Sequence, residues 1–162
     1  MDLYPWLVLV HVLAAFGFAL SHGVSAFVSF AVRRERDPER IKALLDLSST
    51  AIGGLYASLL TLLVAGIAAG IMGNWFGRGW IWASLGILIV VAVAMYAMAT
   101  RYYAEIRSAV GYPPRDKTAA MPAPASREQL ATMLDTRRPE AIAVVGLGGL
   151  ALIVWLMVVK PF

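Results

Sequence analysis

Two histidines, His11 and His22, lie inside an uncharged and mostly apolar run at the start of the chain, and the chain has no other histidine. An ionisable side chain inside a membrane is costly and usually serves an ion, a cofactor, a proton or a partner side chain. Imidazole is a common ligand of haem iron and of transition metals, and it also transfers protons. These two residues are therefore the candidate functional residues.

The spacing of the histidines determines whether they can form one site. Eleven residues separate them, and at about 100° per residue they fall on one face of a helix. At about 1.5 Å per residue they stand roughly 16–17 Å apart along the axis, too far to share one metal ion. The spacing predicts two centres, or one centre and one histidine that only makes a structural hydrogen bond.

A six-coordinate haem in this chain needs a second axial ligand that is not a third histidine. Methionine is the available type, and expected depth pairs Met72 with His11, and Met95 or Met98 with His22. Haem b is the favoured cofactor, and copper(I), which suits imidazole and thioether, is the less favoured one. A symmetric dimer would supply a second imidazole instead. In the alternative without a cofactor, each neutral histidine bonds a serine, a tyrosine or a carbonyl, with candidate side chains Ser21, Ser25 and Tyr56.

Four apolar segments are long enough to cross a hydrocarbon core of about 30 Å, which needs roughly 20 helical residues. They cover residues 3–32, 49–73, 80–100 and 141–159 of a chain that is 60% hydrophobic. We predict one all-α domain over residues 1–162, an up-down-up-down transmembrane four-helix bundle. Asp37 before Pro38, and Ser126 with Gln129, are helix-start signals that extend the helices into the connecting loops, whereas residues 117–125 read as an irregular loop.

Basic residues orient this bundle. Of the 14 lysines and arginines, five lie in the loop 33–48 and seven in the loop 101–139. The positive-inside rule places both loops in the cytoplasm and both termini outside. The net charge of +4 is thus explained by orientation, and no nucleic-acid partner is expected. Four tryptophans lie near the expected outer boundary and predict an aromatic belt: Trp6, Trp75, Trp80 and Trp82.

Small residues predict which helices pack, because lipid tails are as apolar as leucine and close approach replaces hydrophobicity as the driving force. Stripes of alanine, glycine and serine on the first two spans predict a tightly packed antiparallel hairpin. The fourth span, with Gly146, Gly148 and Gly149, is expected to face lipid or a second copy of the chain.

Catalytic residues are not expected. The predicted hydrocarbon core holds no Asp, Glu, Lys or Arg, and the chain holds no cysteine. Paired carboxylates, nucleophile–base pairs and thiolate metal sites are thereby excluded from the membrane region. A proton-coupled permease normally has an intramembrane acidic residue, so transport of a small molecule or metal ion is the last of three function classes.

The sequence LVLVHVLAA at residues 7–15, followed by Gly17, resembles the opening of a clan of small bacterial membrane proteins. The clan includes the copper-resistance protein D family, the HemJ-type protoporphyrinogen oxidases and several uncharacterised four-helix families. The basic loop with Arg36-Asp37 and the Gly79-Trp80-Ile81-Trp82 sequence make the last group the most similar, over about residues 3–107. The resemblance implies a multi-pass protein of the bacterial cytoplasmic membrane, with His11 as haem or metal ligand. Phe16-Gly17-Phe18 departs from the HemJ-type pattern, and His22 lies outside the shared motif.

Two function classes remain ahead of transport. The first is a haem b- or metal-associated protein with a redox or accessory role, in which His11 is a ligand. The second is a structural or accessory subunit, without catalysis, of a larger membrane complex. Either is compatible with a homodimer, and both require the lipid bilayer as environment.

Overall fold

The structure is all-helical over the residues that it describes. A computed structural model describes residues 2–113 and 123–162 of the chain. Its elements are α1 (Tyr4–Arg34), α2 (Pro38–Met72), the 3-10 turn η1 (Trp75–Gly77), α3 (Gly79–Ala109), α4 (Arg127–Leu134) and α5 (Arg138–Val159). Four helical segments are long and apolar enough to cross a membrane: α1, α2, α3 and the stretch Arg127–Val159 that contains α5. The predicted all-α class with four spans is confirmed.

The helices extend beyond the apolar spans, at the positions that the capping signals indicate. Asp37 accepts a hydrogen bond from the backbone N–H of Glu39 at 2.9 Å, so α2 begins at Pro38, well before the apolar span at 49. Ser126 and Gln129 form a reciprocal capping box at the start of α4. The predicted loop 101–139 therefore contains the end of α3, all of α4 and the start of α5. Most of the irregular loop predicted at residues 117–125 lies outside the described residues.

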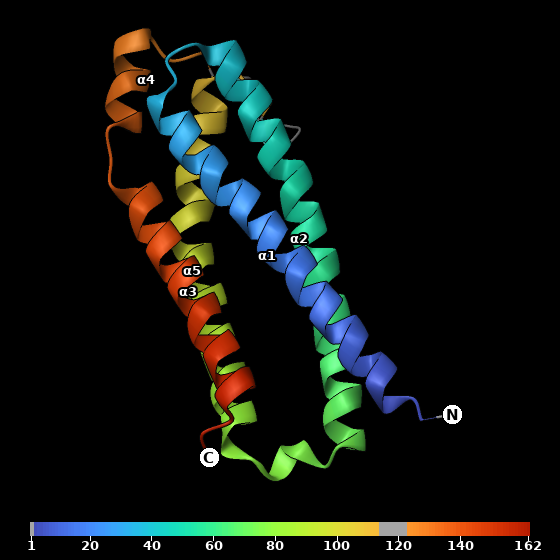
Figure 1. The fold of residues 1–162 in the computed structure, drawn as a ribbon. Coiled ribbons are helices and arrows are strands. Elements are labelled where there is room, and N and C mark those ends of the chain that lie inside the picture. Colours follow the sequence, from blue (N-terminus) through green and yellow to red (C-terminus); the bar gives the residue numbers. More distant parts are fainter. Residues whose placement is uncertain (1, 114–122) are drawn as a thin grey trace.

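The long helices form two antiparallel pairs, α1 with α2 and α3 with α5 (Figure 1). We call the end that carries the 33–48 loop and α4 the basic end, and the end that carries η1 and both termini the tryptophan end. The pairs converge at the basic end and separate toward the tryptophan end, where η1 connects α2 to α3 (Figure 1). Contact between the pairs within the span comes mainly from α1 against α5.

The densest apolar core lies at the basic end. Residues from four helices meet there with almost no exposed surface: Val28, Val32, Ile41, Leu45, Tyr102, Ile106, Val110, Leu130 and Leu134. The short helix α4 closes this cluster, and both of its buried leucines belong to it. Packing at this end is what holds the two pairs together.

A polar network joins the ends of α2 and α3 beside this core. The Tyr112 hydroxyl donates to Asp46 Oδ1 at 2.5 Å, with the Lys42 carbonyl 3.1 Å away. Arg107 donates to the Leu45 carbonyl at 2.8 Å, and its guanidinium lies 5.0 Å from the centre of the Tyr112 ring. Burial first, and then the hydrogen bond to Asp46, raises the pKa of Tyr112.

We expect Tyr112→Phe to lower the free energy of unfolding by about 1 kcal/mol at neutral pH, the net contribution of a hydrogen bond of this kind. Because the folded state raises the pKa of Tyr112, this contribution is complete below the unfolded pKa of about 10 and is lost as pH rises through the folded value. Unfolding of both proteins in detergent across this pH range measures the difference. A difference that persists unchanged at the highest pH would contradict the assignment.

Close approach of α1 and α2 confirms the predicted hairpin. A Cβ built on Gly17 would lie 2.7 Å from Ser58 Oγ, and one on Gly54 would lie 3.0 Å from Ser21 Oγ. Small residues therefore face each other across the interface in both directions, as membrane helix pairs require.

The expectation that α5 faces only lipid or a second copy is wrong for its glycine face. A Cβ on Gly149 would lie 2.4 Å from Val91 of α3, and Gly146 is buried against α1. The glycines allow α5 to approach two helices of the same bundle. The sequence did not reveal this packed face of α5, because the helix is apolar on all sides and has no polar face opposite the packed one.

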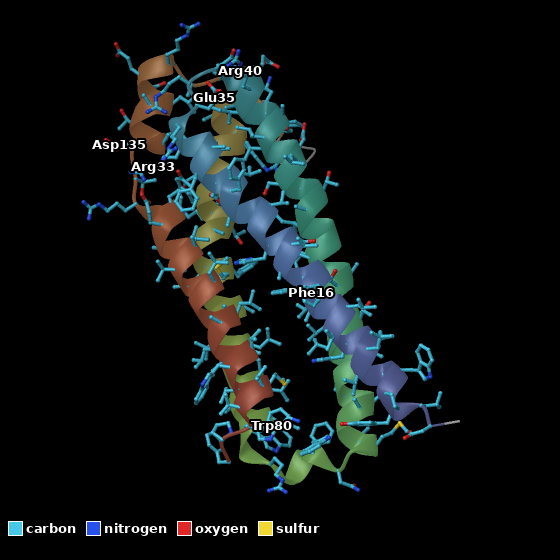
Figure 2. The ribbon with its side chains drawn as sticks, viewed as in Figure 1. Phe16, Arg33, Glu35, Arg40, Trp80 and Asp135 are labelled. Atoms are coloured by element: carbon cyan, nitrogen blue, oxygen red, sulfur yellow. The ribbon has the colours of Figure 1, made fainter. Side chains whose placement is uncertain are left out.

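The four tryptophans do gather at the tryptophan end, but they are not all boundary anchors. Trp80, labelled at this end in Figure 2, is a buried residue, and Trp75 donates its indole N–H to the Tyr4 hydroxyl at 3.0 Å. The Lys160 ammonium lies 4.6 Å from the centre of the Trp75 ring and ties the C-terminus to this cluster. Trp6 and Trp82 remain exposed, as a belt requires.

Candidate functional site

His11 is held by α2. Its Nδ1 lies 2.9 Å from the Leu62 carbonyl oxygen, which can only accept a hydrogen bond, so Nδ1 carries the proton. In the neutral imidazole this leaves the lone pair on Nε2. The ring rests on Gly66, where a Cβ would lie 2.7 Å from Nδ1. A glycine on α2 thus makes the space that the imidazole occupies.

His22 is buried where α1, α3 and α5 meet. A Cβ on Gly146 of α5 would lie 2.4 Å from His22 Nε2 and 3.4 Å from the Met95 methyl group. The ring is stacked nearly parallel to Phe18, with 6.1 Å between centres. Nε2 is buried and has no hydrogen-bond partner among the described residues. His22 therefore packs tightly against the backbone of Gly146, and the Met95 methyl group lies near the same glycine.

The two histidines contact different helices although their spacing puts them on one face. Two packed helices coil about each other, so the face of α1 that meets α2 shifts along its length by about 20° per heptad. In addition, α5 reaches α1 only toward the basic end, where the pairs converge (Figure 1). His11 consequently meets α2 and His22 meets α5, in two separate environments.

The methionines divide unequally between the histidines. Met95 lies against the same glycine as His22. Met98 follows one turn later on α3 and is half-buried. Met72, by contrast, is next to Gly73, whose Cβ position is 3.1 Å from the Tyr4 ring. The structure brings Met95 to His22 and places Met72 near the start of α1, away from the Leu62 and Gly66 level of His11.

The expected side-chain partners of the histidines are not the ones used. His11 bonds a backbone carbonyl, Ser21 faces Gly54, and Tyr56 is exposed. Ser25 Oγ is buried without a partner among the described residues, and the Ser25 carbonyl accepts from Ser29 Oγ at 2.9 Å. Residues 2–113 and 123–162 contain no group of three or more His, Cys, Asp or Glu side chains that could hold a metal ion. Within these two ranges the histidines are thus isolated imidazoles, outside any cluster of metal-binding side chains.

Comparison with known proteins adds the family. A family model described as "Predicted integral membrane protein (DUF2269)" matches residues 5–161, from the first turn of α1 to the end of the chain. The chain belongs to this family. No curated protein and no solved structure matches the chain.

Two glycines against which the histidines of this DUF2269 protein pack were not predicted from the sequence as functional positions. Gly66 was visible only as a small packing residue, and Gly146 only as one of three glycines in an apolar helix. The carbonyl of Leu62 carries no side-chain signal at all. A histidine and a glycine at matching depths on two helices predicted to pack is the one signal that could have paired His11 with Gly66.

Proposed function

We propose that this DUF2269 protein binds haem b or a metal ion through His11 and serves a redox or accessory role in the bacterial cytoplasmic membrane. The hydrogen bond from His11 Nδ1 to the Leu62 carbonyl carries the proposal. Metal-ligating histidines almost always donate their second ring N–H to a carbonyl, a carboxylate or water, which fixes the tautomer and directs the other nitrogen to the metal. His11 has this arrangement without a charged group nearby in the span.

The His11 imidazole is partly exposed, and a groove of 300 Å³ between α1 and α2 is lined by neighbouring residues of α1 but not by His11 itself. The lining of this groove is mainly apolar: Val10, Leu13, Ala14, Ala57, Ser58 and Thr61. His11 would hold the iron and this groove would cover part of the macrocycle, and bound haem supplies a one-electron couple. Because Met72 lies near the start of α1, any further protein ligand of the haem would come from a partner copy or a partner protein.

His22 does not fit a haem. Its Nε2 faces the backbone of Gly146 directly, so a macrocycle would have to separate α5 from α1. The Met95 methyl group lies near the same glycine, and because copper(I) accepts imidazole and thioether ligands, copper(I) at His22 is the second candidate. The unpartnered Nε2 favours this second candidate. The alternative is that His22 serves only to pack the helices.

The absorption spectrum of the detergent-purified protein, expressed in haem-replete cells, tests the proposal. We expect a Soret band with about one haem per one or two chains. Colourless protein would overturn haem binding and favour the structural subunit. Elemental analysis of the same sample for copper separates the His22 candidate from packing.

The orientation and the assembly state complete the proposal. The basic end would lie in the cytoplasm, because it carries the 33–48 and 101–139 loops with most of the arginines. One axial ligand per chain is compatible with a homodimer around one haem or with a larger membrane complex. Transport is the least favoured function, since the four long helices are unbroken and transporters usually bind substrate at interrupted helices.

A further inference from the structure

A polar pocket of 440 Å³ lies at the basic end, where α1 ends, α4 ends and α5 begins. It is lined by residues of both charge signs and by two apolar side chains: Phe30, Arg33, Arg34, Arg36, Leu134, Asp135 and Glu140. Figure 2 shows Arg33 and Asp135 at this junction. Its arginines directly follow Val32, the last residue of the first uncharged run. The pocket therefore lies at the depth where the hydrocarbon core gives way to lipid headgroups.

The charges of this pocket are only partly satisfied from within. Arg33 forms an ion pair with Glu140 Oε1, whereas Glu140 Oε2 is buried without a partner among the described residues. Arg36 uses one nitrogen to bond the carbonyls of Arg33 and Glu35, both at 2.8 Å. Arg34 is exposed and makes no ion pair with any residue that the structure describes. Three arginines against two carboxylates leave the lining with one net positive charge.

We propose that this pocket binds the phosphodiester headgroup of a membrane phospholipid. A phosphodiester carries one negative charge, which matches the net charge of the lining, and guanidinium groups bind phosphate oxygens in a fork geometry. The phosphate lies toward Arg34 and Arg36, and a headgroup ammonium or hydroxyl donates to Asp135. Phe30 and Leu134 contact the glycerol and the first acyl carbons.

Two features favour a lipid over a free phosphate ion. The pocket is far larger than an inorganic anion needs, and ligand sites of about 300–1,000 Å³ hold small organic molecules. Basic pockets between transmembrane helices at the cytoplasmic boundary are typical headgroup sites. A bound lipid would also link α1 to the α4–α5 junction, where the Arg33–Glu140 ion pair already joins α1 to α5.

Thermal unfolding of the delipidated, detergent-purified full chain tests this site. Four additives are titrated at constant ionic strength: dioctanoyl phosphatidylethanolamine, dioctanoyl phosphatidylglycerol, dioctanoylglycerol and inorganic phosphate. We expect both phospholipids to raise Tm with saturation, and the other two to have no such effect in the same range. Arg34→Gln should weaken the apparent affinity about tenfold, since one charge-assisted hydrogen bond is lost.

Arg101→Gln is the matched control, because Arg101 is also exposed at the basic end but pairs with Glu105 on α3, outside the pocket. It should leave the affinity unchanged, as should His11→Ala, so the outcome is separate from that of the haem proposal. Saturation by phosphate or by dioctanoylglycerol in the same range would overturn the phospholipid assignment. An equal loss in Arg34→Gln and Arg101→Gln would reduce it to unspecific attraction by a basic surface.

Discussion

Gly146→Ala is expected to lower the free energy of unfolding by about 1–3 kcal/mol, the usual cost of an extra carbon in a well-packed interior. The new Cβ would lie 2.4 Å from His22 Nε2 and 2.6 Å from Cε1, both atoms of a rigid ring. That ring is itself stacked on Phe18, so it cannot turn away without losing another contact. Either α5 moves outward from α1 or His22 leaves its rotamer, and both changes loosen the α1–α5 contact, the main contact between the two helix pairs inside the span.

Gly148→Ala on the same helix is the matched control, because no atom lies within 4 Å of a Cβ at this position. It should be neutral or slightly stabilising, since alanine favours the helix. Unfolding by SDS titration in mixed micelles measures both variants. A double variant with His22→Ala should recover part of the loss in Gly146→Ala, as expected for residues in contact. Equal effects of the two alanines would contradict the packing of His22 against α5.

The helices were predictable because their signals are local. Apolar length gave the four spans, and Asp37 with Pro38 and Ser126 with Gln129 gave helix starts that the structure reproduces. The α1–α2 hairpin was also predictable, since a short connection and facing small residues leave little choice of partner. Local signals thus gave the elements and one of the two pairs.

The surroundings of the histidines were not predictable from the same signals. His11 bonds the Leu62 carbonyl, and a backbone acceptor looks the same at every residue. His22 faces α5 because the two pairs converge toward the basic end, which depends on how all four helices pack. Depth alone suggested Met95 or Met98 for His22, and the structure places the Met95 methyl group and His22 Nε2 near the same glycine, Gly146. Depth also suggested Met72 for His11. In the structure, Gly73 lies against Tyr4 at the tryptophan end, so the adjacent Met72 is too far along α2 to reach His11.

The polar pocket shows a further limit of sequence reasoning. Its arginines were visible as an orientation signal, but their neighbours Asp135 and Glu140 lie about a hundred residues later in the chain. Only the folding of α4 back onto the end of α1 places these carboxylates beside them. Charge patterning in sequence predicts the cytoplasmic side of the membrane, but it cannot show which carboxylates lie beside these arginines.

His11→Ala is expected to abolish haem binding, because the chain offers no second imidazole that a macrocycle can reach. Gly66→Ala should weaken it by about 10–100-fold, the usual effect of disturbing the group that orients a metal-bound histidine. Its Cβ would lie 2.7 Å from His11 Nδ1 and would push the ring off the Leu62 carbonyl. Gly53→Ala, on the same helix with nothing within 4 Å, should bind haem as the unchanged protein does. Haem affinity measured by absorbance on apoprotein compares these variants, and equal affinities for Gly66→Ala and Gly53→Ala would remove the proposed role of the Leu62 bond.

Titration of haem into the detergent-purified apoprotein, with the unchanged chain, His11→Ala and His22→Ala measured side by side, tests the central claim most directly. Far-UV circular dichroism confirms that each sample is folded before haem is added. We predict a saturating Soret band for the unchanged chain and for His22→Ala, and none for His11→Ala. A band of equal strength and affinity in His11→Ala, or no saturable band in the unchanged chain, would contradict the assignment of His11 as the ligand.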